Sequence, residues 1–317
     1  MSAGTEGRAP TPGQPSALSY TIRRVVKHVQ WARSEGVGRL IEEDRLDPRE
    51  RIRTSVSKAR WRARHGVPPG SAVPVYVVGL QRSGTNMLLR GLDAAPEVEV
   101  RGENDRTVFH RFRLRDDAVL QQTVAASRHA FVLVKPLCDS HRVGALLDLP
   151  GMAPGRAIWA YRDVEDRARS EVAKFGDSNL QALRRIAEGS AAGDWQAGGL
   201  PEQSLELIRS FRYQTMTPET AAALFWYVRN KLFFDLGLAE RQDTMLSSYE
   251  RLTAHPAGSM RRLCDFIGFP HREELSAHIT PRAFHPRRQL DIDPAVRGLC
   301  RGLAERLDEH AGSVPTP

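Results

Sequence analysis

Short apolar runs alternate with helical patterns from residue 73 onward, and this alternation constrains the fold more than any other feature of the sequence. Four runs have the length and composition of buried strands, and they lie at residues 73–79, 130–135, 157–161 and 244–249. Helical patterns lie between or after these runs, at about residues 86–94, 164–174, 218–236 and 256–267. The sequence therefore predicts an α/β fold, a parallel sheet flanked by helices on both faces, in which ligands bind at the carboxyl ends of the strands.

The length of 317 residues predicts one main domain with an N-terminal appendage. Residues 1–17 are small, polar and proline-rich, so we expect them to be disordered. Residues 18–70 are expected to form a basic helical extension and a linker, and residues 71–317 the α/β domain, with a last packing helix at about residues 294–310. The extension is interpreted as packing on the main domain, with contact to a membrane surface or a partner as the alternative.

The composition limits the classes of function. No run of eighteen apolar residues and no apolar export segment is present, so we expect a cytoplasmic protein. The cysteines at 138, 264 and 300 are too few and too widely spaced for a disulfide framework or a zinc cluster, so we expect reduced thiols. The net charge of +8 comes mostly from arginine, which genome composition alone can impose. No nucleic-acid recognition motif accompanies it, and we expect no nucleic-acid partner.

The first predicted strand leads into the loop GLQRSGT, which is bounded by glycines and followed by a helix. Gly79 and Gly84 have the spacing of the Walker loop G-x-x-x-x-G-K-[ST], but Gly84 is followed directly by Thr85 and the lysine is absent. The amides that open the helix, the hydroxyls of Ser83 and Thr85 and the cation of Arg82 can hold a phosphate or sulfate without that lysine. We expect no metal, because no acidic partner for magnesium is evident, and a P-loop kinase or nucleotidase is the alternative.

Charged residues stand at two other predicted strand ends and in one loop. Arg162 ends a buried run and Ser170 follows two turns into the next helix, which suits phosphate binding, although an arginine and aspartate at a strand end more often form a solvated salt bridge. Lys135 ends another run, and its ammonium either binds a ligand or extends from the strand end into the solvent. Glu103 lies in the loop after the first helix, where it is either a general base or a surface carboxylate.

Together these residues resemble the sulfotransferases that use 3′-phosphoadenosine-5′-phosphosulfate (PAPS) and release 3′-phosphoadenosine-5′-phosphate (PAP). The run QRSGTNMLL resembles the 5′-phosphosulfate loop of that family, and YRDVEDRARS resembles its 3′-phosphate site. The resemblance implies a P-loop-like fold and a set of PAPS contacts, namely Gln81, Arg82, Ser83, Gly84, Thr85, Asn86, Arg162, Ser170 and Tyr249. Gln81 and Asn86 depart from the usual proline and threonine of the family. Arg287 and Arg288 either close over the 3′-phosphate or lie in a solvated turn.

The run LDAAPEVEVRGEN resembles the branch that includes tyrosylprotein and several bacterial sulfotransferases, in which a glutamate is the catalytic base. This implies that Glu103 deprotonates a hydroxyl or amine that attacks sulfur in line, with His110 as the reserve base. It also implies that Lys135 and Arg82 stabilise the transferring sulfate. The acceptor is expected to be a small molecule, a glycan or a lipid.

Residues 176–217 match no pattern and are interpreted as a substrate lid. Trp195 within them either lines the acceptor site or anchors the segment to the core. Five other aromatic residues fall on strongly periodic segments and are assigned to the core: Trp159, Trp226, Tyr227, Phe233 and Phe234.

Overall fold

A computed structural model describes residues 48–281 and 289–313 of the chain. The chain divides into two units, Met1–Ile52 and Arg53–Pro317, and the second contains the sheet. The predicted disorder of residues 1–17, the first half of the helical extension, and Arg287 and Arg288 lie outside the described residues.

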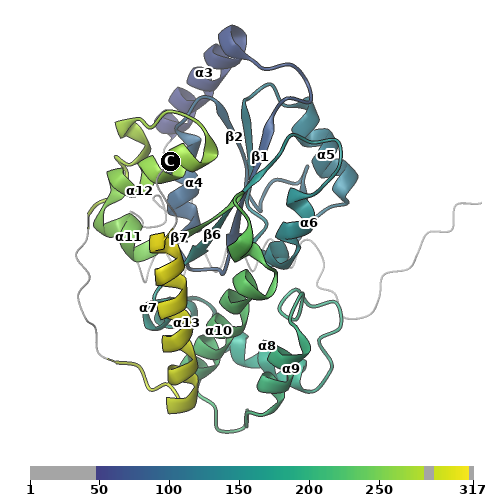
Figure 1. Cartoon of the computed structure of the whole chain (residues 1–317), viewed down its shortest axis with the longest axis vertical. Coiled ribbons are helices and arrows are strands. Elements are labelled where there is room, and N and C mark those ends of the chain that lie inside the picture. Colours follow the sequence, from purple (N-terminus) through teal and green to yellow (C-terminus); the bar gives the residue numbers. More distant parts are fainter. Residues whose placement is uncertain (1–47, 282–288, 314–317) are drawn as a thin grey trace, which may run out of the picture. The chain divides into compact units, whose positions relative to one another are not determined.

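The sheet is parallel throughout and has five strands in the order β2-β5-β1-β6-β7 (Figure 1). The strand bounds are β1 Val73–Gly79, β2 Val98–Arg101, β5 Phe131–Val134, β6 Arg156–Tyr161 and β7 Thr244–Ser248. The four predicted strands are confirmed, and β2 was missed. It is a short edge strand of sequence VEVR in which only Val98 is fully buried, so it lacks the apolar run that marks the other four.

Helices connect the strands and extend the domain beyond them. Their bounds are α3 Pro48–His65, α4 Thr85–Asp93, α5 Asp117–Ala126, α6 Val143–Leu147, α7 Val164–Phe175, α8 Ser178–Ala187, α9 Glu202–Arg209, α10 Pro218–Asp235, α11 Tyr249–Ala254, α12 Pro256–Ile267 and α13 Pro294–Ser313. The short elements are the hairpin of β3 Phe109–His110 with β4 Arg113–Leu114, and the 3-10 turns η1 Leu137–Arg142, η2 Leu238–Glu240 and η3 Glu273–Leu275. The predicted helices within the described residues are confirmed, with small differences at their ends.

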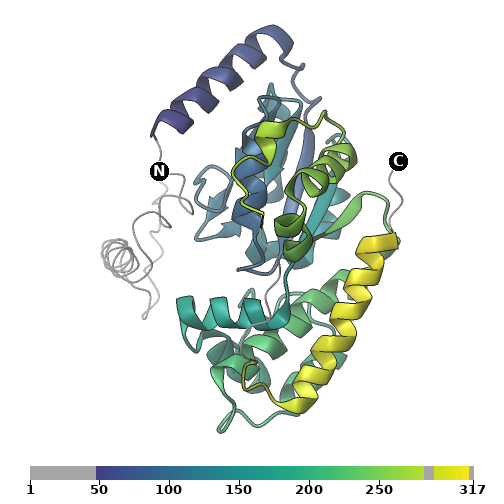
Figure 2. The same cartoon turned by 90° about the vertical axis from the view of Figure 1, so that its left-hand side faces the viewer.

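The two faces of the sheet bury different side chains, because successive residues of a strand point to opposite sides. Val75 and Val77 of β1 pack with α4 and α12, whereas Tyr76 and Val78 belong to a larger cluster with α10 and α13. Helices therefore cover both faces, as predicted (Figure 1). Figure 2 shows further helices, including α10, at the end of the sheet where β6 leads into α7.

The aromatic residues assigned to the core occupy it. Trp159, Trp226 and Phe233 are fully buried, and Tyr227 and Phe234 are partly buried against the same cluster. The three cysteines are buried free thiols, as predicted: Cys138, Cys264 and Cys300. Most of the buried aromatic side chains of the domain thus lie in the larger cluster, on the α10 side of the sheet.

Residues 176–217 have regular structure although their sequence matches no pattern, and their role as a substrate lid stays a prediction. They contain α8 and α9, which bury Leu183 and Ile208 completely. Trp195, between the two helices, lies edge-on to Phe225 with 5.9 Å between ring centroids. The tryptophan therefore anchors the segment to the core, the second of the two roles considered for it.

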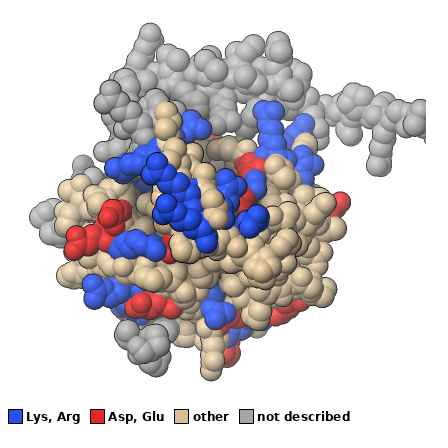
Figure 3. Space-filling view, turned by 90° about the horizontal axis from the view of Figure 1, so that it is seen from above, with Lys and Arg blue, Asp and Glu red and all other residues tan. Residues whose placement is uncertain are grey.

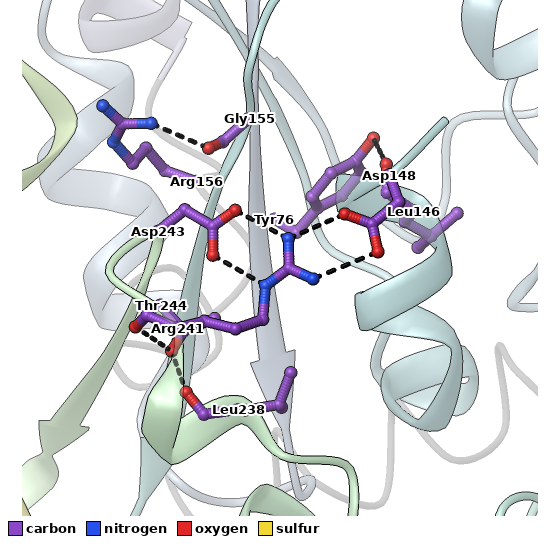
Figure 4. Close-up of polar contacts among 9 residues, drawn as sticks. All are labelled: Tyr76, Leu146, Asp148, Gly155, Arg156, Leu238, Arg241, Asp243 and Thr244. Carbon is purple, nitrogen blue, oxygen red and sulfur yellow. Dashed lines mark hydrogen bonds and ion pairs between the residues drawn. The ribbon is translucent and has the colours of Figure 1, made fainter. Parts of the chain in front are cut away.

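The amino-terminal end of the sheet is closed by paired charges around Arg241 (Figure 4). Its guanidinium donates to both carboxylate oxygens of Asp148, at 2.8 and 3.0 Å, and to both oxygens of Asp243, at 2.8 Å. These bonds raise the pKa of Arg241 above its usual range, because the two carboxylates favour the cation. The network joins the segment that enters β7 to the turn after α6.

The part of the N-terminal extension that belongs to the second unit, from Arg53 onward, packs on the α/β domain, as expected. Lys58 of α3 forms an ion pair with Asp93, and the Trp61 ring stacks on His129 with 5.9 Å between centroids. From residue 51 on, the arginines of α3 are all exposed: Arg51, Arg53, Arg60, Arg62 and Arg64. Basic side chains gather on the face of the molecule seen in Figure 3. Contact of this helix with a membrane or partner stays a prediction. Among the described residues, no helix is both long and apolar enough to cross a bilayer.

Candidate functional site

The loop between β1 and α4 ends in an open helix N-terminus. Gly84 is the N-cap of α4 with a left-handed φ of 82°, and no side chain caps the helix there. Arg82 also has a positive φ, of 70°. The first amides of a helix have no intrahelical acceptor, and here the buried hydroxyl of Ser83 also lacks a hydrogen-bond partner among the described residues. These donors suit an anion at the start of α4.

Both glycines of the loop are required by close packing. A Cβ at Gly79 would lie 2.3 Å from the carbonyl oxygen of Ala160 in β6. A Cβ at Gly84 would lie 2.4 Å from Cδ2 of Tyr249, the first residue of α11. The loop is thus held between the neighbouring strand and Tyr249, which places this predicted cofactor residue directly against it.

Arg162 lies beside the same loop. Its guanidinium carbon is 4.3 Å from the centroid of the Tyr249 ring, and Nη1 donates to the carbonyl oxygen of Arg82 at 3.4 Å. Asp166 lies 3.6 Å from Nη2, while the buried Nε has no hydrogen-bond partner among the described residues. The indole of Trp226 donates to the Arg162 carbonyl at 2.8 Å and fixes the backbone at this strand end.

Ser170 of α7 reaches the same place from the other side. Its hydroxyl accepts from Nε of Arg82 at 2.9 Å. Arg162 and Ser170 therefore both contact Arg82. Helix α7 passes beside the loop, and this position is the one that Ser170 needs if it and Arg162 are to bind the same anion. The structure thus brings Arg82 together with Arg162 and Ser170, which lie 80 and 88 residues further along the chain.

A second convergence joins β5, β2 and α4. The Lys135 ammonium donates to Oδ1 of Asn86 at 2.7 Å and lies 3.0 Å from Oε2 of Glu103. Lys135 is buried and Glu103 half-buried. Glu103 follows the edge strand β2, and Arg101 of that strand is bonded to Asp105 instead of Glu103. His110, the reserve base, is exposed on the β3–β4 hairpin.

Sequence reasoning missed the residues that hold the loop from behind. The hydroxyl of Ser140 accepts from the amide of Gly79 at 3.0 Å and lies 2.9 Å from the Gly79 carbonyl oxygen. The buried guanidinium of Arg167 donates to the carbonyl of Gln81 at 3.2 Å. The Gln81 side chain turns toward Cys138, with 3.8 Å between Nε2 and Sγ. A lone serine in a turn and one arginine among many carry no pattern that marks such roles.

Two half-buried carboxyl groups beside Arg162 were also missed. The Asp163 amide donates to Oε1 of Glu250 at 3.0 Å, and the Asp163 carboxylate caps α7 by accepting from the Asp166 amide at 2.9 Å. Burial raises the pKa of both Asp163 and Glu250 above their ordinary values. They connect the ends of β6 and β7, the two strands that supply Arg162 and Tyr249.

Several solved proteins are similar to this chain. They include a sulfotransferase from Alicyclobacillus acidocaldarius, 14% identical over 78% of this chain and 97% of that chain, with a TM-score of 0.42. Sulfotransferase STF9 from Mycobacterium avium is 13% identical over 95% of this chain and 98% of that chain, also with a TM-score of 0.42. No curated protein matches the sequence. The family model of the sulfotransferase domain matches residues 73–293, which include every described residue of the candidate site, and the chain therefore belongs to the sulfotransferase family.

Proposed function

We propose that this sulfotransferase transfers the sulfuryl group of PAPS to a hydroxyl or amine of its acceptor, with Glu103 as the general base. The observation that carries the proposal is the position of Lys135. Its ammonium contacts Asn86 in the first turn of α4 and Glu103 after β2. One cation thus joins the loop suited to an anion with a carboxylate placed to take a proton beside it.

The loop has donors that fit a phosphosulfate. The open amides of α4, the hydroxyl of Ser83, which has no partner among the described residues, and the side chains of Thr85 and Asn86 surround the helix N-terminus. PAPS supplies the sulfuryl group and a phosphate leaving group, and negative charge grows on the oxygen between them. Arg82 and Lys135 provide the fixed positive charge that favours this change.

A second anion fits beside Arg162. The Nε of Arg162 has no hydrogen-bond partner among the described residues, and its guanidinium carbon lies 4.3 Å from the centroid of the Tyr249 ring. Ser170 supplies a hydroxyl from α7 next to it. The Arg82 side chain donates to Ser170 and its carbonyl accepts from Arg162, so the residues of the proposed 3′-phosphate site lie beside the loop proposed to hold the 5′-phosphosulfate.

Glu103 is suited to proton abstraction in this arrangement. Among the described residues the Glu103 carboxylate pairs with Lys135 alone. A carboxylate has about four positions that accept hydrogen bonds, so Glu103 can also take the proton of the attacking hydroxyl or amine. Lys135 also keeps the carboxylate aimed at the loop. The acceptor is proposed to be a small molecule, a glycan or a lipid bearing a hydroxyl or amine.

Calorimetric titration with PAP in the absence of magnesium tests the proposal, with ATP and AMP as controls. We expect metal-independent binding of PAP that weakens by about 10- to 150-fold in Arg162→Ala, because a charge-assisted hydrogen bond contributes about 1.5–3 kcal/mol. Arg156→Ala is the matched control, since Arg156 begins the same strand at the opposite end of the sheet. Absence of PAP binding, or ATP binding that needs magnesium, would favour the kinase alternative.

A further inference from the structure

Two arginines are buried in the described domain, and their surroundings differ. Arg167 is fully buried, and Arg229 is 3% exposed. Desolvation lowers the pKa of each guanidinium to about 10. Arg167 donates to the Gln81 carbonyl and, at 2.8 Å, to the Asn179 side chain, and it forms an ion pair with Glu171 at 3.1 Å. Its charge is compensated from several sides.

Arg229 of α10 has no comparable set of partners among the described residues. Nη1 donates to the carbonyl of Gly198 at 2.6 Å, and Nη2 has neither a hydrogen bond nor an ion pair in the described part of the chain. Asp139, the carboxylate that attracts Arg229 electrostatically, accepts from Nε of Arg113 and the Leu114 amide, both at 2.7 Å. Asp139 is thus already bonded elsewhere, and a buried guanidinium that bonds no carboxylate itself costs several kcal/mol, which an anion bound at Nη2 would offset.

The position of Arg229 connects it with the proposed site. The turn η1 connects the two: its Ser140 accepts from the Gly79 amide of the loop at 3.0 Å, and its His141 packs against Gly198, whose carbonyl accepts from Arg229. Cys138 is also the residue toward which Gln81 of the phosphosulfate loop turns. The turn η1, which carries Cys138, thus lies against the loop on one side and near α10 on the other.

A second polar group without a partner among the described residues lies beside Arg229. It is the buried Nδ1 of His141, a residue of η1. Burial lowers the pKa of His141 to about 4, assisted by the charge of Arg229, so its ring is neutral near pH 7. The ring packs against Gly198, whose carbonyl accepts from Arg229, and the Trp195 ring centroid lies 5.7 Å from the guanidinium carbon.

We propose that Arg229, with His141 beside it, binds a carboxylate of the acceptor while the acceptor nucleophile meets Glu103. The inference rests on the proposed function, because Glu103 defines where the nucleophile lies. A planar guanidinium matches a carboxylate in shape and charge, and the neutral imidazole adds a donor without adding charge. The proposed acceptor is therefore a small carboxylic acid that also carries a hydroxyl or an amine, with the carboxylate remote from the attacking atom.

The first experiment compares thermal unfolding of Arg229→Met and Arg167→Met without any ligand. Arg167→Met leaves Glu171 buried without its cation, and we expect its Tm to fall by about 10 °C. Arg229→Met removes a cation that lacks an anion, so its Tm is expected within about 2 °C of wild type or above it. Equal losses for the two variants would assign Arg229 a structural role and overturn the proposal.

The second experiment measures the Tm with benzoate and with benzamide, which share the ring but differ in charge. At a benzoate concentration about ten times its Kd, the wild-type Tm is expected to rise by about 3 °C, and benzamide at the same concentration is expected to leave it unchanged. Arg229→Met should abolish the benzoate shift, and Arg229→Lys, which keeps the charge but loses the fork, should at least halve it. Equal shifts from both compounds, or a full benzoate shift in Arg229→Met, would overturn the proposal.

These experiments separate the inference from the proposed function, because neither contains a nucleotide. PAP binding without a benzoate effect would reject the carboxylate site and leave sulfuryl transfer standing. A benzoate effect without PAP binding would keep the carboxylate site and reject the donor.

Discussion

Alanine at Gly84 is predicted to damage the loop in a way that alanine at Gly70 does not. The two glycines have nearly the same φ, 82° and 83°, so alanine adds the same backbone strain of about 1–2 kcal/mol at each. A Cβ at Gly70 meets no described atom within 4 Å, whereas a Cβ at Gly84 lies 2.4 Å from Cδ2 of Tyr249. The difference between the two variants isolates the contact with the tyrosine.

The size of this difference follows from the movement of the Tyr249 ring. Ordinary carbon contacts are about 3.5–4.0 Å, so the ring must shift by at least about 1 Å. An off-rotamer side chain costs about 0.5–1.5 kcal/mol, and separating the ring from the guanidinium of Arg162, now 4.3 Å away, costs about 0.5–2 kcal/mol. Gly84→Ala should therefore lose about 1–3 kcal/mol more stability than Gly70→Ala, and its PAP affinity should fall about tenfold.

Urea unfolding of four variants tests the reasoning: Gly70→Ala, Gly84→Ala, Tyr249→Ala and the double variant of Gly84 and Tyr249. In the Tyr249→Ala background, Gly84→Ala should cost only the backbone strain, which gives a coupling free energy of about 1–3 kcal/mol. Equal losses at the two glycines, with no relief from Tyr249→Ala, would refute the proposed clash.

Three further predictions concern other parts of the site. Glu103→Gln is expected to leave PAP affinity within about twofold but to lower turnover of an identified acceptor by at least about 100-fold, and unchanged turnover would remove Glu103 from the mechanism. Ser140→Ala should lower the free energy of unfolding by about 1–3 kcal/mol in urea, because the buried amide of Gly79 loses its acceptor, and wild-type stability would contradict this role. Between pH 6.5 and 4 the unfolded chain binds a proton at His141 that the folded chain does not bind, so the free energy of unfolding decreases as the pH is lowered through this window. His141→Gln should flatten that fall, and an unchanged pH profile would show that the ring is not the titrating group.

The sequence was sufficient for most of the sheet and for the convergence of its strand ends. In a parallel sheet the residues after the strands meet at one edge, which is why the pattern pointed to Lys135 and Arg162 as residues near the glycine loop. The assignment of Glu103 and Lys135 to the site came from the family resemblance. The edge strand β2 escaped because Glu99 and Arg101 alternate with its valines and only Val98 is fully buried. An edge strand needs less apolar surface than a central one, so its pattern is weaker.

The supporting contacts could not be predicted, because they depend on tertiary packing. Arg167 and Arg229 are two arginines in a chain rich in them, and nothing local distinguishes the paired cation from the unpaired one. Their roles depend on whether Glu171 or a backbone carbonyl lies opposite, which only the packing of α7 and α10 decides. The helices of residues 176–217 were missed for a different reason, since their apolar positions are few and spread over short segments.

The long connections between paired strands have a consequence for how the protein matures. Val73 pairs with Phe131, and Ala157 pairs with Thr244, so each pairing joins distant parts of the chain and closes a large loop. A nascent chain that ends before β7 has the glycine loop but lacks Tyr249, and the proposed donor site is incomplete in it. A nucleotide that needs Tyr249 binds only after the last strand has joined the sheet, and it then stabilises the finished fold by mass action.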